Sequence, residues 1–593
     1  MVRIRPVVSL VSMVAALAAC GGSGGDGGGT NPTPTAPKTV TITPSPISLF
    51  VGDSLQLTAV VRDSNNNILA NSTVTWGSGN GGTATVTAGG RIKGIAAGAT
   101  QVTASASPAS AQAAVTVSAK PAGNAFHPNL STYIAGNDIE LARDVTVDAQ
   151  GNVIVVGNTY SDNFPVTPGA YDVTHATGFD PPADAFIMKI SPGGALVAST
   201  FLGGPNYERI YGVETDAQGF IYVSGRAGAS FPVTNGAFQT TFGGGSTANF
   251  YGPQDALVCK MQPDLSARVW CSYLGVGDDG ISRDLTIDAQ GNVYVVAWTT
   301  AGGFPAGWFT NAYQPTKGAG EDVLVAKIKN DGSQVLWATY LGASGDDGGT
   351  PAIRLDPNGN VIVLLQTTSP DLPTPGSGDH TYGGGATDQY LAKLSPDGSQ
   401  LLYGTYLGGN GGEASETHGL AVDGSGNAYV AVATSSTNLT FPSGNYQSQF
   451  GGGQMDGVLW KVGTNGAILA GTYYGGNALE GIQGVSTDAN GDVYFSATTK
   501  SASVPTTVAG GGNANGQGDA VAVKMSSSLS QLLYAQRFGG SGDETARASW
   551  IGSNGAFVIV GQTDSNNFPL VNALQSQAGG SGLDDAWLIR LIP

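Results

Sequence analysis

A short motif with Asp and, three residues later, Gly recurs seven times downstream of residue 140, and this repetition limits the possible fold more than any other feature. Each copy joins an apolar run to an alternating β-branched and aromatic run, as in Asp288-Ala-Gln-Gly-Asn-Val-Tyr-Val-Val296. Asp and Gly so placed are typical of a tight hairpin turn, so we interpret the Asp as a turn former rather than a metal ligand. The copies begin at Asp148, Asp216, Asp288, Asp356, Asp423, Asp488 and Gly552.

Three further markers follow each of the first six copies, and the first two of them follow the seventh. With the turn motif they make a unit of four strands. They are an aromatic-Pro loop such as Phe231-Pro232, a strand from Asp to Lys such as 255–260, and a strand ending in Tyr-Leu-Gly such as 339–342. Four antiparallel strands per repeat are typical of a β-propeller blade. The seventh unit lacks its fourth strand, and Thr132-Tyr-Ile-Ala-Gly136 precedes the first unit. The sequence therefore predicts an all-β chain whose seven-bladed propeller, residues 130–593, is closed by an N-terminal strand.

These motifs resemble the bacterial SBBP repeat, a β-propeller repeat. Val233-Thr-Asn-Gly-Ala-Phe-Gln-Thr-Thr-Phe-Gly-Gly-Gly245 is close to that family's pattern, as are the Asp-to-Lys and Tyr-Leu-Gly elements. The resemblance implies the fold and no particular activity, because the family has no common function.

The first 129 residues are organised differently. Arg3 and Arg5 precede a short apolar run, and Leu17-Ala-Ala-Cys20 matches a bacterial lipobox. We interpret residues 1–20 as a lipoprotein signal peptide with Cys20 as the lipid attachment site; the alternative is an ordinary secretory signal. The Gly/Ser/Pro/Thr-rich residues 21–37 have the composition of a flexible tether. Resemblance to lipoproteins implies anchoring to the cell envelope, and Gly21 after the Cys favours the outer membrane or cell surface.

Residues 38–118 contain short alternating runs that predict a separate β-sandwich. The order Val51-Gly-Asp-Ser-Leu-Gln-Leu57, Val74-Thr-Trp76 and Gly94-Ile-Ala-Ala-Gly-Ala-Thr100 resembles bacterial Ig-like group 2 (BIG2) domains. Those domains occur in surface proteins as binders or spacers. Residues 119–129 then form a hinge before the propeller.

Charge and motif content exclude several functions. The net charge is −18 and no basic patch stands out, so nucleic acid is not an expected partner. The four histidines form no metal-binding spacing, and no nucleophile elbow, Walker loop or dinucleotide fingerprint occurs in a supporting context. We therefore predict no metal, no cofactor and no catalytic residue.

Two sets of polar residues are expected at one face of the propeller. Acidic residues recur between successive units, where they form either a solvated rim or a site for cations or glycans. A second set lies five residues before each turn motif and is the place where we expect a binding site at the mouth of the channel. Its members are Arg143, Tyr211, Arg283, Pro351, His418, Gln483 and Arg547.

Cys259 and Cys271 fall at matching positions of adjacent strands in the second unit. Antiparallel pairing would place them opposite each other, and an exported protein meets oxidising conditions. We expect a disulfide; two buried free thiols are the alternative.

Three functions fit these features. The preferred one is a non-enzymatic envelope lipoprotein whose propeller binds a protein or glycan, with the Ig-like domain as spacer or adhesion module. The alternatives are an extracytoplasmic lyase or glycan hydrolase with a site at the channel mouth, and a purely structural envelope protein.

Overall fold

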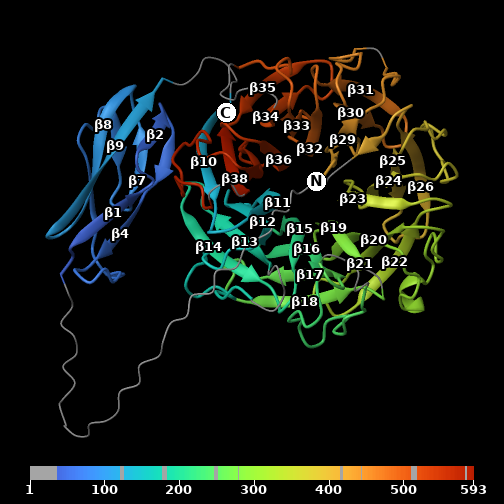
Figure 1. Cartoon of the computed structure of the whole chain (residues 1–593), viewed down its shortest axis with the longest axis horizontal. Coiled ribbons are helices and arrows are strands. Elements are labelled where there is room, and N and C mark those ends of the chain that lie inside the picture. The colour runs from blue at the N-terminus through green and yellow to red at the C-terminus, as the bar shows by residue number, and fades with distance from the viewer. Residues whose placement is uncertain are drawn as a thin grey trace, which may run out of the picture.

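The computed structural model describes residues 36–119, 126–176, 183–245, 251–277, 280–414, 418–442, 444–508, 517–580 and 584–593. Within these residues the chain forms a β-sandwich beside a ring of seven small sheets, which Figure 1 shows from one side of the ring. Apart from strands, the described residues contain one short 3-10 helix, η1 (Ala306–Phe309). The predicted all-β, two-part architecture is confirmed.

The N-terminal sandwich buries one apolar core between a four-stranded sheet (order β2-β9-β8-β5), a three-stranded sheet (β3-β7-β6) and the β1-β4 pair. Alternating burial, as in β9, places every second side chain in this core. Trp76 packs against it from its edge. The strands are β1 (Thr39–Thr43), β2 (Ile47–Phe50), β3 (Ser54–Gln56), β4 (Thr58–Arg62), β5 (Thr75–Ser78), β6 (Ala84–Val86), β7 (Arg91–Gly94), β8 (Gly98–Ala106) and β9 (Ala109–Ser118).

Each propeller blade is a four-stranded antiparallel sheet whose first strand lies innermost. The innermost strands are β11 (Glu140–Val147), β15 (Arg209–Thr215), β19 (Ile281–Ile287), β23 (Asp347–Leu355), β27 (Glu413–Ala414) with β28 (Leu420–Val422), β32 (Glu480–Thr487) and β36 (Glu544–Ile551). The second strands are β12 (Val153–Thr159), β16 (Ile221–Ala227), β20 (Val293–Thr299), β24 (Val361–Thr367), β29 (Ala428–Thr434), β33 (Val493–Thr499) and β37 (Phe557–Thr563).

The outer half of each blade is a tight hairpin. The third strands are β13 (Asp184–Ile190), β17 (Asp255–Met261), β21 (Asp322–Ile328), β25 (Asp388–Leu394), β30 (Asp456–Val462), β34 (Asp519–Met525) and β38 (Asp585–Ile592). The outermost strands are β14 (Leu196–Leu202), β18 (Arg268–Leu274), β22 (Val335–Leu341), β26 (Leu401–Leu407), β31 (Ile468–Tyr474), β35 (Leu532–Phe538) and, for blade 7, β10 (His127–Ile134).

The ring is closed as predicted, by an N-terminal strand in the last blade. Strand β10 pairs antiparallel with β38, from His127 opposite Ile592 to Ile134 opposite Ala586. The strand begins three residues before the predicted start of the propeller. Phe126 is already buried in a core cluster of the propeller, and His127 is buried against Phe50 of the Ig-like domain. In Figure 1, β10 and β38 lie side by side next to the sandwich.

The repeated Asp fixes the turn that ends each innermost strand. Asp148 accepts the backbone N–H groups of Gln150 and Asn152 through Oδ1 and the side-chain amide of Asn152 through Oδ2. Its Oδ2 also lies 3.0 Å from Nζ of Lys189, the Lys that nearly closes the third strand. Asp288 pairs with Lys327 at 3.1 Å and Asp356 with Lys393 at 2.6 Å in the same way. The two repeated charges of the sequence are therefore one structural pair in blades 1 to 6, whereas blade 7 has Gly552 at the turn position.

A disulfide joins Cys259 of β17 to Cys271 of β18. The two residues are direct partners in the strand register, with Cα atoms 4.1 Å apart, and both are fully buried in a core cluster. The bond links neighbouring strands of blade 2 inside the core.

The sandwich contacts the propeller beside the closing strand. Asn572 of blade 7 accepts the backbone N–H of Ser48 and donates to its carbonyl. His127, at the start of β10, lies 3.1 Å from the Asp53 carboxylate and packs against the ring of Phe50. The closing strand is thus held on one edge by β38 and at its start by the Ig-like domain.

Candidate functional site

The residues predicted five positions before each turn lie on the innermost strands or between their segments, and contacts join several of them across blades. Arg143, Tyr211, Arg283 and Arg547 each occupy a register irregularity of an innermost strand. Such β-bulges turn a side chain away from the regular pleat. Gln483 lies beside a similar irregularity, Pro351 lies within one, and His418 lies between β27 and β28. We call the end of the propeller axis at which the innermost strands begin the loop side. The end at which they finish, at the repeated turns, is the turn side.

An arginine–tyrosine cluster occupies the loop side of the axis; it comprises Arg143, Arg209, Arg226, Arg283, Tyr207 and Tyr211. The Arg283 guanidinium lies 4.4 Å from the centre of the Tyr211 ring, and those of Arg209 and Arg226 lie 5.8 Å from it. Burial would raise the pKa of Tyr211, but Arg209, Arg226, Arg283 and Arg143 together outweigh it and lower the pKa to about 6. The cluster is strongly cationic.

His418 crosses the axis and separates the loop side from the turn side. From blade 5 its Nε2 lies 2.9 Å from the Tyr211 carbonyl of blade 2 and 3.5 Å from Asp144 of blade 1. Its Nδ1 lies 3.6 Å from Asp284 of blade 3. Burial would lower the pKa of His418, yet Asp144 and Asp284 raise it above its ordinary value. His418 is only 3% exposed, so it is a buried connector between blades rather than a ligand-binding residue at a mouth.

The two aspartates also tie adjacent blades together. Asp144 accepts the Val213 N–H at 2.8 Å, and Asp284 accepts the Ile353 N–H at 3.0 Å. Each bond joins an innermost strand to the one that follows it in the ring. Asp284 further binds Arg354 at 2.6 Å. A charged layer at mid-axis therefore links blades 1 to 5.

Below this layer, the turn side contains an axial pocket that the sequence analysis missed. A cavity of about 250 Å³ is lined by six of the seven residues that lie two positions before the repeated turns: Glu214, Thr286, Arg354, Ala421, Ser486 and Trp550. Counting two residues back from each turn would have identified these residues from the sequence, just as counting five residues back identified Arg143, Tyr211 and the others. The cavity shares Thr487, Trp550 and Ile551 with a wider mouth of about 680 Å³.

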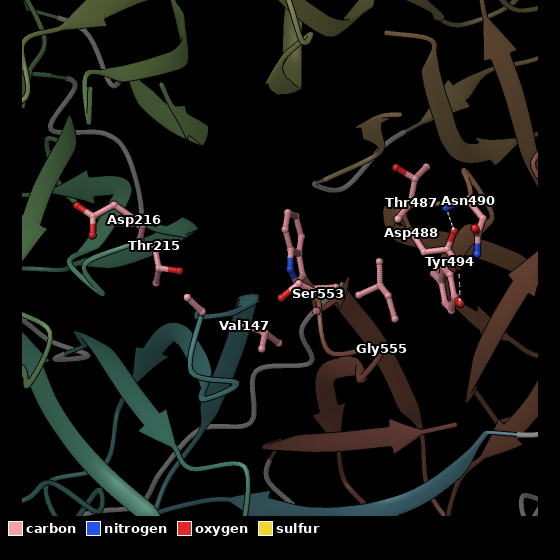
Figure 2. Close-up of a pocket in the computed structure, with 15 residues that line it drawn as sticks. Val147, Thr215, Asp216, Thr487, Asp488, Asn490, Tyr494, Ser553 and Gly555 are labelled. Atoms are coloured by element: carbon pink, nitrogen blue, oxygen red, sulfur yellow. Dashed lines mark hydrogen bonds between the residues drawn. The ribbon is translucent and has the colours of Figure 1, made fainter. Parts of the chain in front are cut away.

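Figure 2 shows this mouth, with Thr215 and Asp216 on one side and Thr487, Asp488 and Asn490 on the other. The two aspartates are committed to the structure of their turns. Asp216 accepts the N–H groups of its own turn and the Tyr222 hydroxyl, and Asp488 is bound equivalently, with Tyr494 as its hydroxyl donor. The mouth therefore presents hydroxyl and amide groups, and its carboxylates are already occupied.

Glu214 is the acidic side chain of the inner pocket. It is partly exposed within the cavity, and burial, assisted by Asp144 and Asp284 and opposed by Arg354, raises its pKa to about 7. Trp550 lies in the same cavity and is also partly exposed. An aromatic face beside one weakly acidic carboxyl, one guanidinium and several hydroxyls is suited to a ligand with both C–H and O–H surfaces.

The acidic residues between units do not form the expected rim. Six of them are fully buried at the start of the innermost strands: Glu140, Glu208, Asp347, Glu413, Glu480 and Glu544. Glu140 is representative, because it accepts the N–H of Gly136 and the hydroxyl of Thr159. Asp346 and Asp543 remain exposed, while Asp278, Asp279 and Glu416 lie outside the described residues. These six buried carboxylates close the loops between blades instead of facing solvent.

These buried carboxyls predict that the protein is most stable at mildly acidic pH. Burial raises the pKa of Glu140 to about 7, of Glu208 to about 8 and of Asp388 to about 7. A carboxyl whose pKa is raised in the folded state contributes stability that is fully present below its unfolded-state pKa. This contribution is lost as the pH rises through its folded-state pKa. We expect the thermal unfolding temperature to decrease as the pH is raised from 5 to 8.

A matched variant tests the cause of that fall. Glu208→Gln removes the carboxyl with the highest of these pKa values, so it should flatten the decline of the midpoint between pH 6 and pH 8. The exposed Asp543→Asn variant should keep the wild-type slope. A wild-type midpoint that rises steadily from pH 5 to pH 8 would contradict the assignment.

The other histidines do not join a common site. His175 is buried against Phe201, with ring centres 5.4 Å apart, and His380 is exposed. Among the described residues no group of His, Cys, Asp and Glu has the arrangement of a metal site. In that part of the chain, no helix has the length and apolarity needed to cross a membrane.

Comparison with known families agrees with both halves of the fold. Residues 36–117 match the bacterial Ig-like domain (group 2), and residues 269–305 and 402–440 match the SBBP β-propeller repeat. The chain therefore carries a group 2 bacterial Ig-like domain followed by SBBP repeats. A comparison with curated proteins finds no significant match.

Several solved structures resemble the chain at low sequence identity. A PL25 polysaccharide lyase, ulvan lyase, is 10% identical with a TM-score of 0.43, over 75% of this chain and 96% of that one. A protein of unknown function from Dyadobacter fermentans is 9% identical with a TM-score of 0.37, over 79% of this chain and 100% of its own. Puromycin hydrolase is 15% identical with a TM-score of 0.36, over 74% and 54% of the two chains. Likeness at this level carries no information about activity.

Proposed function

We propose that this chain, with its Ig-like domain and SBBP-repeat propeller, is an exported glycan-binding protein of the cell envelope whose ligand enters the axial pocket on the turn side. The observation that supports the proposal most is Trp550 inside that pocket, beside Glu214, Arg354 and the hydroxyls of Thr286 and Ser486. Trp550 packs against the apolar core cluster of blades 1 and 7 but stays partly exposed in the pocket, so part of its indole can meet a ligand. Sugars combine an apolar face with hydroxyls, and aromatic rings with a few polar groups suit both.

The carboxylates of the pocket favour binding over hydrolysis. Glycoside hydrolysis ordinarily uses two carboxyl groups that flank the scissile bond. In the described lining of the inner cavity Glu214 is the acidic side chain, and Asp216 and Asp488 at the mouth are held by their own turns. A single Glu beside Arg354 can bind hydroxyls but does not supply the second carboxyl.

Export and anchoring are part of the same proposal. Cys20 and the tether lie outside the described residues, so their support is the lipobox and the composition of residues 21–37. The Ig-like domain would then hold the propeller away from the lipid surface. Labelling with a radioactive fatty acid should mark the wild-type chain and not the Cys20→Ala variant. If the variant is still labelled, Cys20 is not the lipid attachment site.

A glycan array with the purified protein tests the binding function. The wild-type protein should bind a defined set of glycans, and Trp550→Ala should weaken binding by roughly tenfold to a hundredfold, as expected for loss of an aromatic anchor. Trp550→Phe should retain much of the affinity. Trp308→Ala is the matched control, since η1 packs against the outermost strand β22, where Phe309 stacks on Tyr340. No binding to any glycan, or equal binding by Trp550→Ala, would contradict the proposal.

A further inference from the structure

The arginine–tyrosine cluster on the loop side contains three cations, Arg143, Arg209 and Arg226, that have no carboxylate partner among the described residues. Arg209 is 6% exposed and Arg226 is 4% exposed. Arg354 and Arg537 each pair with an aspartate, whereas no carboxylate of the described residues lies within ion-pair distance of Arg143, Arg209 or Arg226. The buried Nε atoms of these three arginines also have no hydrogen-bond acceptor in that part of the chain.

Aromatic contacts offset this burial only in part. The Arg226 guanidinium lies 4.1 Å from the centre of the Tyr251 ring and 4.9 Å from that of Tyr207, and Arg209 lies 5.2 Å from Tyr207. A cation–π contact stabilises less than the removal of a guanidinium from water costs. Neighbouring guanidinium groups also repel one another. Burial, and next to it this repulsion, lowers the pKa of Arg143 to about 9. Even with Tyr211 ionised, one negative charge faces the three positive charges of Arg143, Arg209 and Arg226, so the site is short of negative charge.

We propose that this cluster is an anion-binding site that takes an oxyanion group, a carboxylate or a sulfate, of an acidic ligand. Planar guanidinium groups donate paired hydrogen bonds to such groups, and the unpartnered Nε–H groups of Arg143, Arg209 and Arg226 supply the donors. Arg143 is only partly buried, so in this proposal the ligand approaches the cluster past Arg143. The site lies on the opposite side of His418 from the glycan pocket and does not depend on Trp550.

Tyr211 provides a spectroscopic signal for occupancy. The charged and titratable groups that act on it are Arg143 from β11, Arg209 from its own strand, Arg226 from β16 and Arg283 from β19, and Tyr207 lies nearby. Because these arginines lower its pKa to about 6, we expect Tyr211 to be ionised in the free protein at neutral pH. A bound oxyanion offsets their charge, so Tyr211 takes up a proton and the tyrosinate absorbance falls.

The experiment combines calorimetric titration with ultraviolet difference spectra of the full chain at pH 7.5. The probes are glucuronate, sulfate and phosphate, with neutral glucose as a control, and their order of affinity identifies the preferred oxyanion. The wild-type protein should bind at least one of the three and lose tyrosinate absorbance on binding. Tyr211→Phe should bind but give no absorbance change.

Arginine variants separate a binding site from a structural cluster. Arg226→Gln and Arg143→Gln should each weaken binding by roughly tenfold to a hundredfold, the usual effect of losing a charge-assisted bond. Without anion, Arg226→Gln should unfold at a higher temperature than the wild type, because an unpaired buried cation has been removed. Arg91→Gln, at the exposed first residue of β7 in the Ig-like domain, should behave as wild type. No binding of the three probes, or binding that Arg226→Gln and Arg143→Gln leave unchanged, would overturn the proposal.

Discussion

Deleting residues 126–136 will prevent the propeller from forming a stable ring. Without β10, the partner edge of β38 loses its hydrogen bonds and becomes an exposed strand edge, a site of aggregation. The deletion also removes Tyr133, which is 1% exposed and joins two loop residues by donating its hydroxyl hydrogen to the Ser565 carbonyl and accepting the Phe568 N–H. We expect the deletion variant to be recovered mainly as aggregate in size-exclusion chromatography.

A point variant tests the same closure without a truncation. Tyr133→Ala should lower the free energy of unfolding by about 3–5 kcal/mol, as measured for large aromatic residues truncated in a core. Tyr446→Ala is the matched control, because its side chain is 36% exposed and the change should cost about 0.5 kcal/mol or less. Denaturant unfolding measures both. If the Tyr133 and Tyr446 variants unfold alike, β10 does not hold the ring closed.

Replacing His418 by Asn should cost about 3–5 kcal/mol, the loss seen when one partner of a buried ion pair is removed. His418 contacts three blades across the axis, and its loss leaves Asp144 and Asp284 buried with less compensation. Its φ of 56° lies in the left-handed region, which Asn tolerates, so the variant removes the contacts without adding backbone strain. Equilibrium unfolding near neutral pH measures the effect.

The pH dependence of this effect identifies its origin. Because the folded-state pKa of His418 is raised, its contribution is fully present below the unfolded value of 6.5 and is lost as the pH rises through the folded value. The difference between His418→Asn and wild type should therefore shrink at alkaline pH. The exposed His380→Asn is the control and should match wild type throughout. A His418 variant as stable as wild type at pH 6 would show that the axial layer is not an ion-pair network.

The repeated turns were enough to predict the propeller and its closure. The repeated turn occurs seven times, six times with Asp and once with Gly552, and the seventh unit is short of one strand. A strand near Thr132 can supply it and complete the last blade. In the Ig-like domain, β2 and β7 have weak sequence signals, because each is four residues long and lies among Pro and Gly residues that are typical of loops.

The site was harder to predict because its residues depend on partners far away in the sequence. The burial of Glu140 follows from the Thr159 hydroxyl 19 residues later, which a loop acid does not reveal. His418 was placed at a mouth because its contacts with blades 1 to 3 become apparent only when the ring is closed. Positional counting found the arginine–tyrosine cluster through Arg143, Tyr211 and Arg283. It missed Arg209, which lies two residues before Tyr211, and Arg226, which comes from the second strand of blade 2.

A crystal structure of the protein with the glycan that binds best on the array tests the central proposal most directly. We expect a sugar ring stacked on the Trp550 indole, with hydroxyls within hydrogen-bond distance of Glu214 and Arg354 in the turn-side pocket. A glycan bound instead on the Ig-like domain or on the outer strands of the blades, with the axial pocket empty, would contradict the account.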